Sequence, residues 1–441
     1  MFGLAVDIGT TTVSALLVDL HTTGVCAKAT AYNAQIRYGA DVIFRIINQQ
    51  KSDGINRLQK AIVKDTLEPL IDGLCVSAGI SRNQIIKLTV AANTTMNHFL
   101  LGIDANSIRL APYEPKFLEF PVFMSADIGI TLAHGAKMIL APNIGSYVGG
   151  DITAGVLAAA TPSKQKIWDR PEMSLLVDLG TNGEIVFGNN EFLMACACSA
   201  GPAFEGGDIS CGMRASDGAI EACNIDNDTL EPNLKLIGGT KPAGICGSGL
   251  IDIIAELFRI GAINGKGKFH EKEVPADKSN PTAVKRVQFD SYGTGRYILV
   301  YAKDSSTGSD ISITETDIDN FIRAKAAIFS GIMSLLTPLG FTPTNIDDVL
   351  IAGGIGSGIN IRNAIRIGML PDLPRKKYSY IGNSSQDGAY QMLISDEAES
   401  KVTNIAQNMT YIDLSTEPNY MNEFIAACFL PHTDETLFPS E

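Results

Sequence analysis

The sequence predicts an α/β protein with two lobes, and three observations lead to this fold class. Short apolar runs typical of strands alternate along the chain with longer stretches of helical spacing. Three glycine-rich turns each follow one of these strands, at 7–12, 178–183 and 351–356. The first two turns share one design, a strand that ends in Asp and is followed by Gly-Thr. The chain is therefore expected to contain an internal repeat.

The first lobe, residues 1–165, is expected to open with a hairpin and to continue with helices. Strands are predicted at 4–6, 13–18, 25–29 and 85–90, and helices at 39–48, 56–78 and 152–160. The polar stretch 161–166 is the most linker-like segment in the middle of the chain, so the lobe boundary is placed there.

The second lobe, residues 166–441, is expected to repeat the hairpin. Strands are predicted at 174–177, 184–187, 192–195 and 348–350, and helices at 250–258, 316–336 and 390–395. Residues 263–304 hold most of the Lys, Asp, Pro and Gly of their region. This composition predicts an inserted surface sub-domain.

The two Asp-x-Gly-Thr turns have the chemistry of a phosphate clamp. Glycine lacks a Cβ, so backbone N–H groups and small hydroxyls can approach phosphate oxygens closely. Asp7 and Asp178 can hold Mg²⁺ through water, because this cation prefers oxygen ligands. Residues expected to bind phosphate are Gly9, Thr10, Thr11, Thr12, Gly180, Thr181 and Asn182. Residues expected to lie against a nucleoside are Gly353, Gly354 and Gly356. For each turn taken singly, a plain hairpin capped by its Asp is the alternative.

This order of motifs resembles the actin-like ATPase superfamily, which includes sugar kinases, acetate kinase, heat-shock chaperones and actin. Its members have the order phosphate-1, connect-1, phosphate-2, adenosine and connect-2. Segment 142–151 matches connect-1, and segment 382–389 matches connect-2. The resemblance implies two RNase H-like lobes around a nucleotide cleft, with an inserted sub-domain in the second lobe.

Further segments carry a more specific resemblance. They are 38–42, 198–206, 211–215, 244–252, 313–318, 324–328 and 429–432. With them, residues 3–435 look like the ATPase region of the reductive activators of corrinoid-dependent enzymes. The resemblance implies that ATP hydrolysis drives the reduction of cobalt(II) to cobalt(I) in a corrinoid methyl-carrier protein of a methyltransferase system. In that family the electron arrives through an iron–sulfur domain of the same polypeptide.

The cysteines depart from that family pattern. The chain has eight cysteines and contains neither C-x₄-C-x₂-C nor C-x₂-C-x₂-C. Cys196 and Cys198 form the closest pair, in an apolar strand where core packing is the usual role. We expect reduced core thiols and no iron–sulfur cluster within this chain, so the electron must come from a separate donor or from a fused iron–sulfur domain. A homodimer is also compatible with the resemblance.

Other candidate site residues lie outside the two clamps. Gly247 and Ser248 open a predicted helix whose N-terminus could receive an anion or a ribose, and close helix packing is the alternative use of these glycines. Asp151 begins the connect-1 helix, where the superfamily often has a residue that faces the γ-phosphate. We expect Asp151 to orient the attacking water, with helix capping as the alternative. Glu184 and Glu205 are further candidates for this task.

Composition and charge bear on partners and location. Asp and Glu number 48 against 35 Lys and Arg, a net charge of −13, which disfavours nucleic acid and anionic membranes as partners. The first strand begins at once, and no uncharged apolar stretch reaches the ~18 residues of a membrane span. The expected location is the cytoplasm.

One motif offers a competing interpretation. Asp19 to Gly24 matches D-x-H-x-x-G, with which some corrinoid proteins supply His as the lower cobalt ligand. Here the motif falls between two predicted strands, so we expect a hairpin turn with Asp19 and His21 facing solvent.

Two other functions remain open. A small-molecule kinase of the same superfamily is the main alternative, although the first lobe has no sugar-type cluster of Asn, Asp and His. A non-catalytic filament or scaffold subunit is the third reading.

Overall fold

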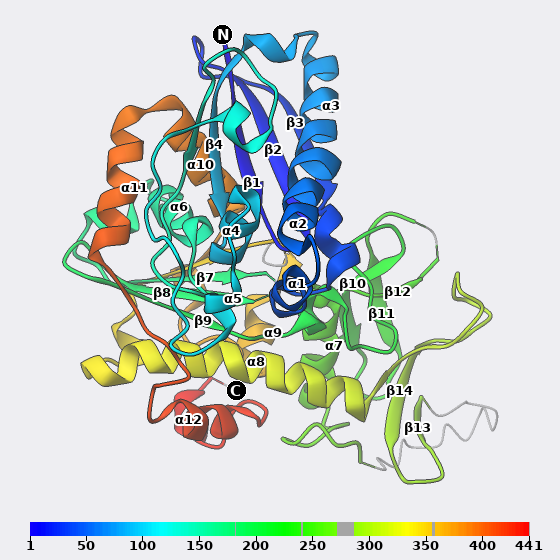
Figure 1. Cartoon of the computed structure of the whole chain (residues 1–441). Coiled ribbons are helices and arrows are strands. Elements are labelled where there is room, and N and C mark those ends of the chain that lie inside the picture. Colours follow the sequence, from blue (N-terminus) through cyan, green and yellow to red (C-terminus); the bar gives the residue numbers. More distant parts are fainter. Residues whose placement is uncertain (181, 240, 271–285, 355–357, 441) are drawn as a thin grey trace. The chain divides into compact units, whose positions relative to one another are not determined.

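In the computed structural model, the described residues are 1–180, 182–239, 241–270, 286–354 and 358–440 (Figure 1). The chain divides into two compact units. Unit 1 comprises Met1–Leu176, Val186–Cys196 and Asn383–Ile412, and unit 2 comprises Val177–Ile185, Ala197–Gly382 and Asp413–Glu441. The predicted lobe boundary near residue 165 stays a prediction.

Unit 1 contains a six-stranded sheet with the order β3-β2-β1-β4-β6-β5. Its strands are β1 Phe2–Ile8, β2 Thr12–Asp19, β3 Val25–Tyr32, β4 Ile85–Ala92, β5 Phe123–Met124 and β6 Lys137–Leu140. β1, β2 and β3 form an antiparallel meander, and β4 joins β1 in parallel. The apolar run of β1 explains its central place, because Leu4, Val6 and Ile8 are all buried. The carboxyl ends of β1 and β4 therefore lie side by side.

Helices cover both faces of this sheet. They are α1 Val42–Gln49, α2 Gly54–Ile62, α3 Glu68–Ala78, α4 Thr94–Leu101, α5 Asn106–Arg109, α6 Gly150–Ala158, α10 Ser384–Ile394 and α11 Asp396–Asn408. Helix α3 packs on β2 and β3, whereas α6 and α10 pack together against the other face (Figure 1). The predicted helix over 56–78 is continuous through a π-helical turn, Val63–Leu67. The predicted helix over 39–48 begins later, because Asp41 accepts a bond from Phe44 N and caps α1.

The second sheet repeats the plan of the first, with the order β17-β16-β7-β8-β9-β18. Its strands are β7 Ser174–Leu179, β8 Gly183–Gly188, β9 Leu193–Cys198, β16 Asp348–Ala352, β17 Tyr378–Gly382 and β18 Met409–Tyr411. Strands β7, β8 and β9 neighbour one another as β1, β2 and β3 do, and β16 adjoins β7 as β4 adjoins β1. The predicted internal repeat is confirmed.

Two small sheets lie entirely within unit 2. One consists of β10 Ala219–Ile225, β11 Pro232–Leu236 and β12 Gly244–Ile245, and the other of β13 Val287–Phe289, β14 Gly295–Val300 and β15 Ile311–Thr314. The helices are α7 Gly247–Arg259, α8 Glu315–Leu336, α9 Ile361–Arg366 and α12 Tyr420–Ala427. The predicted insertion, 263–304, supplies β13 and β14.

Short helical turns link these elements. They are η1 Ala34–Tyr38, η3 Arg82–Gln84, η4 Ser125–Ile128, η5 Ile167–Asp169, η6 Pro202–Glu205, η7 Thr337–Leu339, η8 Pro343–Asn345, η10 Arg375–Lys377 and η11 Glu435–Leu437.

Helix α8 is the core helix of unit 2. Within the described ranges, one helical segment, Glu315–Leu339, has the length and apolar composition of a membrane span, and 72% of its most apolar window is buried. Burial of this kind is also usual for the core helix of a soluble domain. The helix itself was predicted over 316–336, but charged residues interrupt its apolar run, so the sequence does not predict a membrane span here.

Cysteine burial follows the prediction only in part. Cys75, Cys196, Cys198, Cys223 and Cys246 are buried free thiols. Cys26 is exposed on β3, so the expectation of a core position is wrong for it, because β3 lies at the sheet edge.

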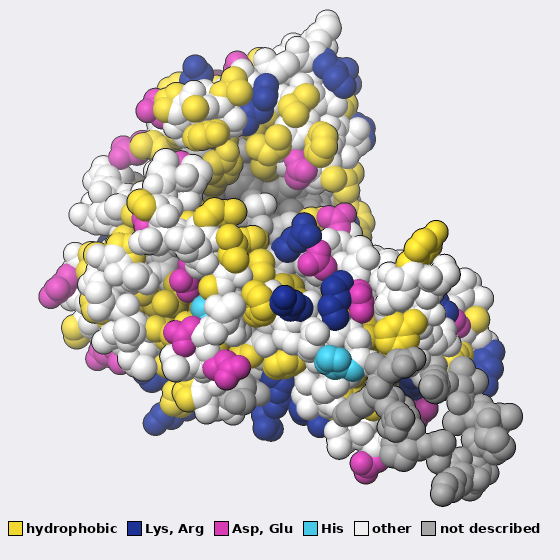
Figure 2. Space-filling model, turned by 90° about the horizontal axis from the view of Figure 1, so that it is seen from below, with side chains coloured by type: hydrophobic (Ala, Val, Ile, Leu, Met, Phe, Trp, Pro, Cys, Tyr) yellow, Lys and Arg dark blue, Asp and Glu magenta, His cyan; other side chains and the backbone are white. Residues whose placement is uncertain are grey.

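Charged side chains are mixed on the surface. On the face in Figure 2, acidic and basic side chains are interspersed, with hydrophobic side chains between them. The negative net charge is therefore not gathered into one patch on this face.

Candidate active site

The Asp7 carboxylate is held by the connect-2 segment, within unit 1. Asn383 Nδ2 donates to one carboxylate oxygen at 2.8 Å, and Ser385 Oγ donates to the other at 3.0 Å. Asn383 also caps α10 by accepting a bond from Gln386 N. Burial raises the pKa of Asp7 above its ordinary value, and the two hydrogen bonds act in the opposite direction. The end of β1 and the start of α10, almost 380 residues apart in sequence, thus form one polar site.

The turn after β1 is tightly fixed. Gly9 N donates to Thr12 O at 2.9 Å, and a Cβ on Gly9 would lie 2.7 Å from that oxygen. Asn93 Nδ2 donates to Thr10 Oγ1 at 3.1 Å, and Asn33 Nδ2 donates to Gly9 O at 3.0 Å. Two asparagines with no predicted role therefore help to fix the conformation of this turn.

The connect-1 segment meets the same region. A Cβ on Gly149 would lie 2.4 Å from Thr94 N and 2.6 Å from Asn93 Cα, so the two backbones touch. Asp151 follows in the first turn of α6, where its Oδ1 accepts a bond from Ile152 N. An anionic side chain at a helix N-terminus stabilises the helix by itself, so helix capping alone can explain the position of Asp151. Its role toward a phosphate stays a prediction.

Unit 2 holds the second clamp and two of the nucleoside glycines, Gly353 and Gly354. Gly180 N donates to Asn182 O at 3.0 Å, which closes the turn after β7. Gly353 has φ +89°, and a Cβ there would lie 2.6 Å from Asp178 Oδ1 and 2.4 Å from Leu179 O. The glycine loop after β16 therefore lies directly against the Asp of the second clamp. Two predicted site residues, Thr181 and Gly356, lie outside the described residues.

The glycines at the start of α7 are needed for packing. A Cβ on Gly247 would lie 2.1 Å from Phe204 O, and one on Gly249 would lie 2.1 Å from Ile220 O. The packing alternative therefore accounts for both glycines. Ser248 adjoins the chain beyond the glycine loop, because a Cβ on Gly358 would lie 3.0 Å from Ser248 Oγ.

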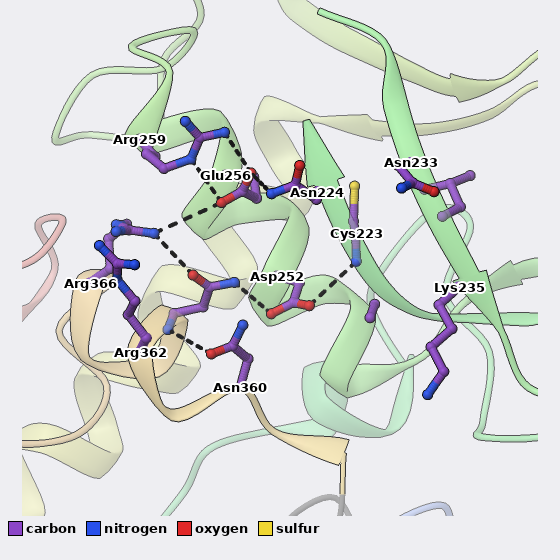
Figure 3. A pocket seen from close by; sticks show the side chains of 13 residues that line it. Cys223, Asn224, Asn233, Lys235, Asp252, Glu256, Arg259, Asn360, Arg362 and Arg366 are labelled. Carbon is purple, nitrogen blue, oxygen red and sulfur yellow. Dashed lines mark hydrogen bonds and ion pairs between the residues drawn. The ribbon is translucent and has the colours of Figure 1, made fainter. Parts of the chain in front are cut away.

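A polar pocket of about 450 Å³ lies within unit 2, beside the start of α9 (Figure 3). Its lining comes from α7, α9, β10 and β11 and comprises Ala222, Cys223, Asn224, Asn233, Leu234, Lys235, Asp252, Glu256, Arg259, Asn360, Arg362, Asn363 and Arg366. In Figure 3, Lys235 and Arg362 make no interaction with the other side chains drawn. The pocket therefore has donor groups at its margin and carboxylates on its floor.

The two carboxylates of the pocket are firmly positioned. Asp252 accepts bonds from Asn363 Nδ2 at 2.7 Å and Cys223 N at 3.3 Å, and burial raises its pKa. Glu256 is also buried, but hydrogen bonds from Arg259 and Ile225 N overcome this effect and lower its pKa. Sequence reasoning missed these two carboxylates, although both lie on α7 four residues apart, because partners such as Asn363 and Cys223 come from other elements. The local signals were this spacing on α7 and the Asn360-x-x-Asn363 spacing after the glycine loop.

The other residues named in the sequence analysis, Glu184, Glu205, His21 and Asp19, have the following positions. Glu184 is the second residue of β8 and Glu205 the last of η6. His21 is exposed in the turn between β2 and β3, which confirms the predicted hairpin position, and its backbone N donates to Asp19 Oδ1. Asp19 itself is only half exposed. Over the described residues, no three His, Cys, Asp or Glu side chains gather as a metal site would require.

Comparisons with known proteins agree with this geometry. Residues 172–441 match the family model described as the C-terminal domain of RACo, the ASKHA domain, and residues 2–163 match the RACo middle region. The chain is 32% identical over 427 residues to the corrinoid activation enzyme RamQ of Eubacterium limosum, covering 96% of this chain and 70% of that protein. It is 22% identical to the [Co(II) methylated amine-specific corrinoid protein] reductase of Methanosarcina barkeri, covering 96% and 76%.

A solved structure extends the similarity to three dimensions. The structure described as reductive activator for corrinoid,iron-sulfur protein has a TM-score of 0.86 and 45% identity, covering all of this chain and 68% of that one. The predicted actin-like ATPase fold is confirmed. The chain belongs to the RACo family of corrinoid-protein reductive activators.

Proposed function

We propose that this chain is an ATP-dependent reductive activator of a corrinoid protein. ATP hydrolysis by the chain drives the reduction of cobalt(II) to cobalt(I) in that protein. The observation that carries the proposal is the Asp7 carboxylate, held by Asn383 and Ser385 beside the Gly9–Thr12 turn, in a chain of the RACo family. A half-buried carboxylate next to a glycine turn combines a cation ligand with a phosphate cradle.

The clamp residues and Asp151 have different proposed roles toward ATP. Asp7 and Asp178 would hold Mg²⁺ through water, and the bound cation would neutralise charge on the phosphates. The turns at 9–12 and 180–182 donate backbone N–H groups and hydroxyls to phosphate oxygens. Asp151 orients water, because phosphoryl transfer needs positioning more than a strong base.

The unit 2 pocket is proposed to receive the adenosine part of ATP. Its volume of about 450 Å³ suits a nucleoside. Asp252 and Asn363 offer fixed acceptors and donors to base or ribose, and the start of α9 follows the glycine loop that contains Gly353 and Gly354. Arg362, exposed at the margin, can stack on a planar base.

The partners follow from the family. A corrinoid protein of a methyltransferase system is the proposed client, and the electron comes from a separate donor or a fused iron–sulfur domain. Cytoplasmic location and a homodimer belong to the same proposal.

Steady-state ATP hydrolysis tests the proposal against its alternatives. The purified chain with Mg²⁺ should hydrolyse ATP, and the rate should rise when a cobalt(II) corrinoid protein is added without any small acceptor. Turnover that depends on a small hydroxyl or carboxyl acceptor would favour the kinase alternative. Absence of ATP binding and turnover under all conditions would favour a scaffold.

A further inference from the structure

Arg45 on α1 is a fully buried cation with no ion-pair partner among the described residues. Its exposure is 0%, yet no carboxylate among the described residues lies within 4.0 Å of its guanidinium. Nε donates to Gly39 O at 2.9 Å and Nη1 to Gln35 Oε1 at 3.3 Å. Nη2 is buried and has no hydrogen-bond partner. Both acceptors are neutral, so the positive charge is solvated only by dipoles.

Such an arrangement is unfavourable in the unliganded protein. Buried charges are normally paired, because removal from water costs more than neutral hydrogen bonds return. Burial lowers the pKa of Arg45 to about 10, and Asp41 offsets this only in part. The Asp41 carboxylate is half-buried, and it caps α1 by accepting a hydrogen bond from Phe44 N. The fold therefore keeps the positive charge of Arg45 buried without an ion pair among the described residues, and we look for an anion outside the protein that balances it.

A short chain of buried side chains joins Arg45 to the first phosphate turn. Arg45 Nη1 lies 3.8 Å from Met96 Sδ, and Asn33 Nδ2 lies 3.5 Å from the same sulfur. Asn33 Nδ2 also donates to Gly9 O at 3.0 Å. Asn33 and Met96 are both 0% exposed. The positive charge thus lies behind the Gly9–Thr12 turn, separated from it by the buried side chains of Met96 and Asn33.

We propose that Arg45 is a positioning residue for ATP, whose buried charge is balanced by phosphate bound at the Gly9–Thr12 turn. The inference rests on the proposed ATP binding of this chain. Across buried side chains the attraction between guanidinium and phosphate is screened less than in bulk water, so contact is not required. The unpaired cation is retained because it becomes favourable only when the anion is bound.

The experiment compares Arg45→Met, which removes the charge but keeps the length, with Arg45→Lys, which keeps the charge. Arg82→Met is the matched control, because Arg82 is paired with Asp72 and Glu68 in the same unit. Dissociation constants for Mg-ADP, a non-hydrolysable ATP analogue and adenosine are measured by calorimetry, and thermal midpoints are measured with and without each ligand.

Arg45→Met should bind the two phosphorylated ligands on the order of tenfold more weakly, with adenosine affinity unchanged. Its midpoint without nucleotide should equal or exceed that of the wild type, because an unpaired buried charge has been removed. Arg45→Lys should recover part of the loss, and Arg82→Met should bind normally.

Equal loss for adenosine and ATP analogue, unchanged affinity, or a variant that cannot fold without nucleotide would each overturn the inference. Those outcomes differ from failure of the proposed function, in which the wild-type chain itself would bind no Mg-nucleotide.

Discussion

The Asp7 carboxylate is half-buried, and its hydrogen-bond partners are a neutral amide and a hydroxyl. Burial raises the pKa of Asp7 and so disfavours its charged form. A divalent cation bound nearby would stabilise that charged form. We expect Asp7→Ala and Asp178→Ala each to lower the ATP hydrolysis rate by about a hundredfold, with circular dichroism unchanged. Asp19→Ala is the control, because Asp19 ends the neighbouring strand but serves only the β2–β3 turn. Wild-type turnover in either clamp variant would remove that residue from the site.

Asp151 requires a separate measurement, because capping of α6 and orientation of water are both consistent with its position. Asp151→Asn keeps a capping oxygen but removes the charge. If the residue orients water, kcat should fall about tenfold or more while the affinity for a non-hydrolysable ATP analogue stays within twofold. An unchanged kcat would leave capping as its role.

Lys325 gives a pH dependence that can be tested. It is fully buried on α8, where its Nζ donates to Phe429 O and Pro431 O, and burial lowers its pKa to about 7. Between about pH 7 and the unfolded-state value of about 10.4, the unfolded lysine binds more protons than the folded one. The free energy of unfolding attributable to Lys325 should therefore rise with pH across this window and be lowest below it.

Urea denaturation at several pH values, for the wild type and Lys325→Met, isolates this contribution. The wild-type free energy of unfolding should increase relative to the variant as the pH rises above about 7. A difference that does not change with pH would mean that the lysine titrates alike in both states.

At the scale of single elements, α7 shows which glycines are structural. Gly249 sits where a Cβ would lie 2.1 Å from Ile220 O of β10, whereas Gly73 in α3 has nothing within 4 Å. We expect Gly249→Ala to lower the free energy of unfolding by about 2 kcal/mol or more, because the backbones must separate. Gly73→Ala should raise it by about 0.5–1 kcal/mol, because alanine restricts the unfolded chain. Similar effects of the two substitutions in chemical denaturation would contradict this packing assignment.

The elements also show what a sequence can predict. Strand β1 and the turn at Gly9 were predictable, because the apolar run, the Asp and the glycine are adjacent in sequence. The late start of α1 was not, because it depends on capping by Asp41 rather than on apolar spacing. The Asn383 and Ser385 contacts to Asp7 join residues far apart in sequence, and no local pattern reports such a pairing. The same holds for Arg45, since only the folded structure shows that its Nη2 is buried with no hydrogen-bond partner among the described residues.

For the whole molecule, the two six-stranded sheets explain why the repeated strand-and-turn plan could be predicted from the sequence. Each sheet places the first of its three consecutive strands beside a strand from later in the chain, β4 in one sheet and β16 in the other. The residues that follow β4 and β16, Asn93 and Gly353, adjoin the two clamps. The repeat specifies these positions by topology. It does not specify the chemistry there, which is an amide in the first sheet and a glycine in the second.

The proposed function makes one prediction for the molecule as a whole, that nucleotide and cobalt state are linked through the affinity for the corrinoid protein. Reduction of cobalt(II) is uphill, and about 60 mV of one-electron potential corresponds to a tenfold change in equilibrium. A partner that removes an axial ligand from cobalt(II) would supply such a shift. This chain without any electron donor should then bind the cobalt(II) corrinoid protein and perturb its absorption spectrum.

The cobalt(I) and methylated forms should bind more weakly, and ATP should change the cobalt(II) affinity by the same factor by which the corrinoid protein changes ATP affinity. Titrations by calorimetry and absorption, each with and without a non-hydrolysable ATP analogue, measure both sides of this cycle. Asp7→Ala is the matched variant, because it should keep corrinoid-protein binding while losing the response to nucleotide. Equal affinity for all cobalt states, with and without nucleotide, would contradict this mechanism and favour the kinase alternative.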